Sequence, residues 1–241
     1  MSITERQKKV LMAIIQEFME SADEVGSVAL LQKYNLGVSS ATVRNEMVRL
    51  MKEGLLEKSH ISSGRCPTDQ AIRMYVKQEL DAHSHNPLVT VEIRQGIFRE
   101  RFSKDAVTHS VLHTLSKETN SVAFVVLDGI LRYWGLSNLF QYEELSNQKI
   151  IRSLIDILED PVFLVNLSKK YGSSRVSLLI GEESGVDSLQ ECSIAFIDTP
   201  FWNTQTASVG VLGSKRMDYL KVVPALKEVR NSLQASMRGW S

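Results

Sequence analysis

The chain has 241 residues, 43% of them hydrophobic, with 28 basic residues against 28 acidic ones and a formal net charge of zero. This length suffices for two packed domains, and no apolar run approaches the length that spans a bilayer. The balanced charge excludes a broadly basic, nonspecific nucleic-acid binder, so any DNA affinity must be local to one surface. Because residues 2–20 are charged and helix-like, we expect no secretory signal and a cytoplasmic protein with no membrane contact.

Two helices are predicted before residue 36. Apolar side chains at helical spacing run through residues 3–21, and Thr4 with Gln7 forms a capping-box start. A second short helix opens at residues 26–27, and residues 35–37 make a tight turn after it. A short turn before a third helix is typical of a helix-turn-helix.

Residues 37–50 predict the most informative helix of the chain. Ser39 is the expected N-cap, since Val38 and Val43 flank it at the spacing of a hydrophobic staple. One helix face is apolar, and the opposite face carries Ala41, Thr42, Asn45 and Arg49. Asn and Arg pair bidentately with adenine and guanine edges, and Ser39 and Ser40 offer hydroxyls and backbone N–H groups to a phosphate. The pattern predicts a DNA recognition helix, although an amphipathic helix with a solvated polar face fits it too.

A wing is predicted after this helix. Gly54 suits a helix end, residues 55–58 suit a strand, and residues 61–65 supply a turn with glycine where positive φ is needed. We expect Lys58 on the first strand and Arg65 at the wing tip to reach the DNA, although surface loops also carry arginines without such a role. The predicted DNA-binding residues are Ser39, Ser40, Ala41, Thr42, Arg44, Asn45, Arg49, Lys58 and Arg65.

Three segments are expected: a winged-helix domain at 1–80, a linker and connecting helix at 81–116, and a second domain at 117–241. Asp128-Gly129 is the strongest hairpin signal, and Pro224 is expected to kink or split the last helix. Strands are predicted at 121–127, 131–136, 176–180, 192–198 and 206–212, and helices at 67–80, 89–115, 147–158, 160–171 and 217–238. This order indicates an α+β fold in which the second domain holds a mostly antiparallel sheet.

Catalysis and metal binding have little support. His109 and His113 share a helix face, but no glutamate adjoins His109 as in a metalloprotease helix. Cys66 and Cys192 are too far apart in sequence to form a disulfide framework or a metal spacing. No glycine-rich phosphate loop or nucleophile elbow is present, so we expect neither an enzyme nor a cofactor.

Several motifs together resemble the HrcA family of heat-inducible transcription repressors. In the first half these are TERQKKVL at 4–11, VGS at 25–27, LGVSSATVRNEM at 36–47, GLLEK at 54–58 and SSGRCPTD at 62–69. In the second half they are WGLSNLF at 134–140, IGEE at 180–183, CS at 192–193 and GSKRMDY at 213–219. The resemblance therefore covers both ends of the chain.

The resemblance implies a repressor of chaperone operons that binds an inverted-repeat operator in double-stranded DNA and is kept active by the GroEL chaperonin. It also implies a GAF-like second domain and a homodimer. Two departures stand out: the inserted segment that takes part in dimerisation in the family is missing here, and Ser214 and Lys215 stand where proline and threonine are usual.

Two other functions remain open: a winged-helix regulator whose GAF-like domain binds a small molecule, and a hydrolase or transferase with a DNA-binding appendage. For a homodimer without the insert, we expect the contact to use the helix at 89–115 and the sheet. The apolar residues expected at that contact are Ile93, Ile97, Val107, Val111 and Leu115.

Overall fold

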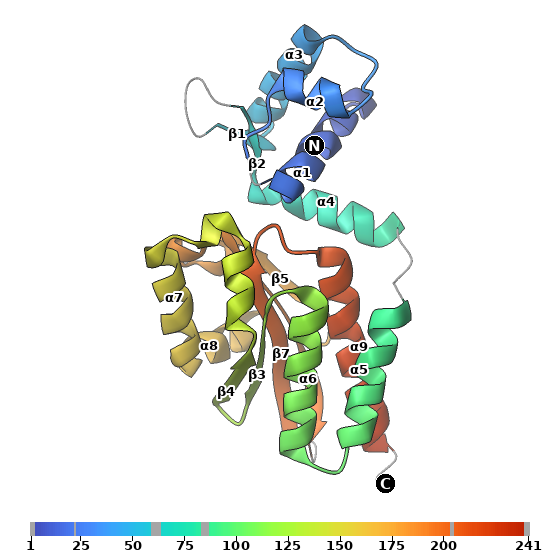
Figure 1. The fold of residues 1–241 in the computed structure, drawn as a ribbon, viewed down its shortest axis with the longest axis vertical. Helices are drawn as coiled ribbons and strands as arrows, with labels where there is room; N and C mark the ends of the chain where they lie inside the picture. The colour runs from blue at the N-terminus through green and yellow to red at the C-terminus, as the bar shows by residue number, and fades with distance from the viewer. Residues whose placement is uncertain (1–2, 22, 59–63, 83–86, 203–204, 239–241) are drawn as a thin grey trace. The chain divides into compact units, whose positions relative to one another are not determined.

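A computed structural model describes residues 1–241 except 1–2, 22, 59–63, 83–86, 203–204 and 239–241. The chain divides into two compact units, Met1–Ala82 and His83–Ser241 (Figure 1). The helices of the segment expected to be a linker and connector lie in the second unit. Each unit has its own hydrophobic core, so each is described by itself.

The first unit is a helix-turn-helix with a short two-stranded wing. Its elements are α1 (Glu5–Ser21), α2 (Ser27–Lys33), α3 (Ser40–Lys52), β1 (Leu56–Glu57), β2 (Cys66–Pro67) and α4 (Asp69–Ala82). The predicted capping box is present, because the Thr4 N–H donates to Gln7 Oε1 at 2.8 Å and the Gln7 N–H donates to Thr4 Oγ1 at 3.2 Å. Fully buried Leu11, Ile14 and Leu50 lie in the core between the helices.

The glycines around the wing act in two different ways. Gly54 ends α3 with φ 71°, the left-handed conformation that the sequence predicted there. The prediction of positive φ in the wing turn is wrong for Gly64, whose φ lies outside the left-handed region. Glycine is needed at this position because a Cβ would lie only 2.7 Å from the carbonyl carbon of Glu24.

The second unit is built on a five-stranded antiparallel sheet in the order β4-β3-β7-β6-β5. The strands are β3 (Val122–Leu127), β4 (Ile130–Trp134), β5 (Ser177–Ile180), β6 (Cys192–Trp202) and β7 (Gln205–Ser214). Asp128 and Gly129 turn between β3 and β4 with φ 55° and 74°, as the hairpin signal predicted. The fold class is α+β, with a GAF-like second unit.

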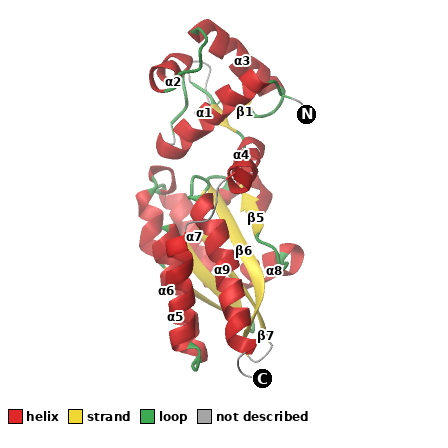
Figure 2. Cartoon of the chain, turned by 90° about the vertical axis from the view of Figure 1, so that its right-hand side faces the viewer, coloured by secondary structure: helices red, strands yellow, loops and turns green. Residues whose placement is uncertain are grey.

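Helices cover both faces of this sheet (Figure 2). On one face, α6 (Lys104–Thr119) and α9 (Tyr219–Arg238) pack against the central strands, and α5 (Pro87–Glu100) packs on both helices. On the other face, α7 (Gln148–Glu159) and α8 (Pro161–Tyr171) enclose a core that includes Phe124 and Phe196. The short helices η1 (Leu136–Gln141), η2 (Glu143–Leu145), η3 (Gly181–Ser184) and η4 (Asp187–Leu189) complete the unit. Every residue of β3 is buried, as a strand covered on both faces requires.

Two helix predictions need correction. The single helix expected at 89–115 is two helices, since Ser103 caps a new one by accepting a hydrogen bond from the Ala106 N–H at 3.3 Å. The split expected at Pro224 is wrong, because α9 continues through it in its second turn and buries Val222 and Leu226 beside it. Across the described ranges, none of the helices combines the length and apolarity of a membrane span.

Candidate nucleic-acid interface

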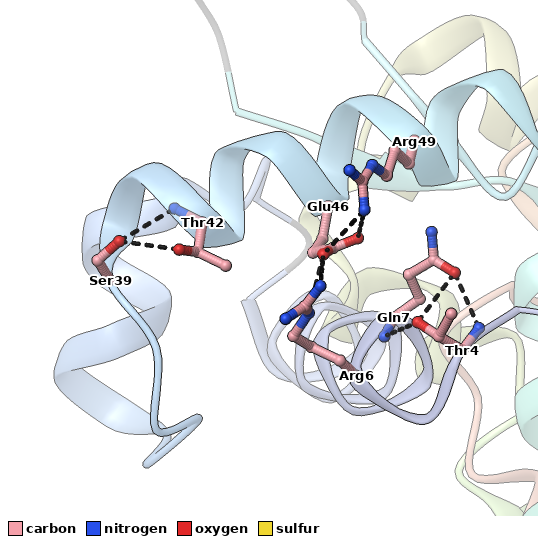
Figure 3. A network of polar contacts seen from close by, with 7 residues as sticks. All are labelled: Thr4, Arg6, Gln7, Ser39, Thr42, Glu46 and Arg49. Carbon is pink, nitrogen blue, oxygen red and sulfur yellow. Dashed lines mark hydrogen bonds and ion pairs between the residues drawn. The ribbon is translucent and has the colours of Figure 1, made fainter.

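Helix α3 is fixed at its start by a cap and along one side by the core. Ser39 is the N-cap, as predicted: its Oγ accepts from the Thr42 N–H at 3.2 Å and lies 3.0 Å from Thr42 Oγ1 (Figure 3). Val43, Met47 and Leu50 are buried in the core of the first unit. A helix held in this way presents its opposite side in a fixed orientation.

The side of α3 that faces away from the core carries most of the predicted DNA-binding residues. Ala41, Arg44, Asn45 and Arg49 are exposed, Ser39 is exposed at the helix start, and Ser40 and Thr42 are half-buried. A major groove admits an α-helix, and this side of α3 carries residue types that can pair with base edges and phosphates.

Glu46 of the same helix carries a buried charge, and no role was predicted for it from the sequence. Its side chain is only 2% exposed, and two arginines bridge its carboxylate (Figure 3). Arg6 of α1 donates from Nε to Glu46 Oε1 at 2.9 Å, and its Nη2 lies 2.8 Å from that oxygen. Arg49 Nη1 lies 3.4 Å from both carboxylate oxygens. Arg6 belongs to α1, and this ion pair places its side chain beside the exposed face of α3.

The wing places Lys58 close to its expected position. Lys58 follows β1 and is half-buried, and β1 pairs with β2 through Leu56 with Pro67 and Glu57 with Cys66. The predicted tip, residues 59–63, lies outside the described residues.

Arg65 is not at the wing tip, so that prediction is wrong. Its backbone pairs with Val25 through two hydrogen bonds of 3.0 and 3.1 Å, which fasten it at the base of the wing. Its side chain is half-buried, and Nη1 donates to the Gly64 carbonyl at 2.8 Å. The local pairing with Val25, which sequence periodicity cannot reveal, determines where this residue lies.

The histidines of α6 contact an aromatic ring. His109 and His113 are exposed, and their ring centroids lie 5.3 and 5.9 Å from that of Trp134 on β4. Among the residues that the structure describes, no three His, Cys, Asp or Glu side chains come together as metal ligands. Burial raises the pKa of the Cys192 thiol to about 12, so this thiol stays protonated and unreactive at neutral pH.

The WGLSNLF segment joins β4 to the rest of the second unit. Gly135 has φ 90°, and a Cβ there would lie 1.9 Å from Ser116 Oγ. Asn138 Nδ2 donates to Ser116 Oγ at 2.9 Å and to the Ser121 carbonyl at 3.0 Å. The motif therefore holds η1 against the end of α6 and has a structural role.

The GSKRMDY segment contributes a buried ion pair to the second unit. Arg216 donates from Nε and Nη2 to the two Glu144 oxygens at 2.8 and 2.9 Å, and Ser214 Oγ donates to the same carboxylate at 2.6 Å. Burial alone would raise the pKa of the Glu144 carboxyl, but the hydrogen bonds from Arg216 and Ser214 outweigh it and lower that pKa. Ser214, one of the two departures from the family pattern, therefore serves as a hydrogen-bond donor here.

Comparison with known proteins relates both units to one group. Residues 36–223 match the family described as "HrcA protein C terminal domain". Three similar curated proteins are each named heat-inducible transcription repressor HrcA. That of Clostridium botulinum (strain Eklund 17B / Type B) is 24% identical over the whole of both chains. That of Pelotomaculum thermopropionicum is 24% identical over 99% of each, and that of Pseudarthrobacter chlorophenolicus is 32% identical over 80% of this chain and 53% of its own.

The alignment with the Clostridium botulinum relative runs over 344 positions, so roughly a hundred of them have no counterpart in the 241 residues of this chain. Among solved structures, the crystal structure of a hypothetical protein at 2.2 Å resolution matches 99% of both chains with a TM-score of 0.79 and 19% identity. That structure has the same fold.

Proposed function

Because the chain belongs to the HrcA family of heat-inducible transcription repressors, we propose that it represses chaperone operons by binding double-stranded DNA through α3. The observation that carries this proposal is the exposed Asn45 and Arg49 on a helix whose other side is locked into the core. The relatives are repressors, and the chain belongs with them and not with enzymes.

The residues of the interface divide into two roles. Asn45 and Arg49 read base edges, while Ala41 and Thr42 lie beside them and contact thymine methyls or bases. The residues that position the unit on phosphates are Ser39, Ser40, Arg44, Lys58 and Arg65. Arg65 makes that contact from the base of the wing, near the backbone of Val25.

The operator is an inverted repeat, and the protein binds it as a homodimer. One winged-helix module has too few basic residues for tight binding, and a dimer doubles the number of phosphate contacts. The five apolar residues expected at the dimer contact are not available for it. Ile93, Ile97, Val107, Val111 and Leu115 are all buried within the second unit. Among the side chains described in this region, those of Val91 and Phe98 on α5 and Phe102 just after it are apolar and exposed, so we place the contact at these residues.

In this proposal the protein works in the cytoplasm and a GroEL-type chaperonin keeps it active. A second unit with an antiparallel sheet of distant strands folds slowly, and β3 is apolar along its whole length. Unfolded clients that occupy the chaperonin would lower the pool of active repressor, and repression would lapse.

A small-molecule sensor is the second candidate, favoured by a groove of about 660 Å³ between α5 and α9. The rings of Phe98 and Phe102 line it with Arg94, Arg101 and Glu228. Because Arg94 pairs with Glu228 at 3.0 Å, Arg101 is the cation that a small aromatic carboxylate would contact. A rise in melting temperature with a benzoate series would support this candidate.

Genome-wide mapping of bound sites tests the main proposal. Enrichment of chaperone promoters, with an inverted repeat beneath the peaks, is the expected result. Peaks spread over unrelated metabolic operons would refute chaperone control and favour the sensor.

A further inference from the structure

Two arginines share one buried carboxylate where α1 meets α3. The Glu46 side chain is 2% exposed, whereas those of Arg6 and Arg49 are 54% and 60% exposed. One guanidinium is enough to neutralise one carboxylate, so the cluster carries a surplus positive charge at the edge of the exposed face of α3 (Figure 3).

The carboxylate holds the two arginines unequally. Arg6 approaches through two nitrogens at 2.8 and 2.9 Å, within the range of strong charge-assisted hydrogen bonds. Arg49 approaches through one nitrogen at 3.4 Å, near the limit of a hydrogen bond. Arg49 is therefore the partner that leaves Glu46 at lower cost.

A bidentate contact to guanine that uses both terminal nitrogens of Arg49 requires this side chain to leave Glu46, because one of them, Nη1, lies 3.4 Å from the carboxylate. If Arg49 were the sole partner, its departure would strand a buried, unpaired carboxylate, which is strongly unfavourable. With Arg6 in place, the carboxylate stays paired throughout.

We propose that Arg6 is a positioning residue for sequence recognition: it keeps Glu46 neutralised and so frees Arg49 to reach a base edge. This inference rests on the proposed function of α3 as the reading helix. It assigns to α1 a share in operator selectivity, although Arg6 itself touches no base.

The test compares full-length variants on two duplexes: one enriched by the wild-type protein from a random-sequence library, and a scrambled version. In Arg6→Gln we expect the ratio of the two affinities to fall about tenfold, with an unchanged salt dependence, because Arg49 then stays on Glu46. Arg6→Lys should keep the ratio, and adding Glu46→Gln to Arg6→Gln should restore it. Arg44→Gln is the matched control, for which we expect equal losses on both duplexes and a salt slope lower by about one.

Several results would overturn the inference. One is an unchanged ratio in Arg6→Gln, another is a uniform loss like that of Arg44→Gln, and a third is a double variant without rescue. If Arg6→Gln does not fold, the single variant Glu46→Gln decides. We expect its ratio of affinities for the two duplexes to stay at the wild-type value. A lower ratio would overturn the inference, because it would mean that the carboxylate aims Arg49 at the DNA. A wild-type protein that enriches no sequence would refute the proposed function itself, and the inference with it.

Discussion

Replacing Asn45 by alanine separates base reading from folding. The side chain is exposed on α3 and makes no contact with the core, so we expect the free energy of unfolding to change by less than about 0.5 kcal/mol. A lost bidentate contact to adenine costs about 1–3 kcal/mol, which is roughly a 5- to 150-fold weaker operator affinity. Affinity for random DNA should stay unchanged, and fluorescence anisotropy with both duplexes measures the difference.

Val43→Ala is the control on the opposite side of the same helix. Val43 is fully buried, so removing its two methyl groups should lower the free energy of unfolding by about 2 kcal/mol, as urea denaturation would measure. The folded fraction of this variant should keep the wild-type ratio of affinities for the two duplexes. Equal losses on operator and random DNA in Asn45→Ala would show that Asn45 reads no base.

Four further predictions concern the wing, the second unit and its folding. Lys58→Ala should weaken binding to operator and random DNA alike and lower the salt slope by about one; an unchanged slope in a salt titration would remove Lys58 from the phosphate contacts. Gly135→Ala should lower the free energy of unfolding by about 3 kcal/mol, because φ is 90° at this position and the added Cβ would clash with Ser116. Gly129→Ala is the control: its Cβ would meet no atom, so only backbone strain of about 1 kcal/mol is expected. The pKa of the Glu144 carboxyl is lowered in the folded state, so its stabilisation is present above the unfolded pKa and is lost as the pH falls through the folded one. Urea midpoints should accordingly fall less on acidification in Glu144→Gln than in wild type or in the exposed control Glu143→Gln; equal falls in all three would contradict this role. Operator binding by freshly refolded full-length protein should rise when chaperonin is added, and full recovery without it would count against chaperonin control.

Local signals in the sequence predicted much of α3 and its surroundings. Ser39 caps the helix because a serine oxygen satisfies an N–H group within three residues, and that rule needs no knowledge of the rest of the chain. The same holds for the Thr4 and Gln7 box and for the hairpin at Asp128 and Gly129. Each of these features is determined by neighbours in sequence.

The features that sequence could not predict depend on partners far along the chain. Glu46 and Arg49 are spaced to interact on one helix, but Arg6 reaches the carboxylate from 40 residues away. An antiparallel β-bridge between Arg65 and Val25 holds Arg65 at the base of the wing. Position 64 likewise requires glycine because the backbone of Glu24 lies too close for a Cβ, whereas the sequence suggested a positive φ there.

The apolar residues of α5 and α6 illustrate a more general limit. Helical spacing marks Ile93, Ile97 and Val111 as one apolar face, but the prediction that this face forms a dimer contact is wrong, because all three side chains are buried within the second unit. In the structure α5 and α6 pack against each other and against α9, which lies more than a hundred residues later in the chain. Phe98 on α5 and Phe102 just after it are instead exposed, with 59% and 73% of their surfaces accessible. Both rings lie against the Arg101 guanidinium, at 3.9 and 4.2 Å from their centroids, so they form one exposed patch. A dimer contact on this chain is better sought at that patch than among the residues that form the core.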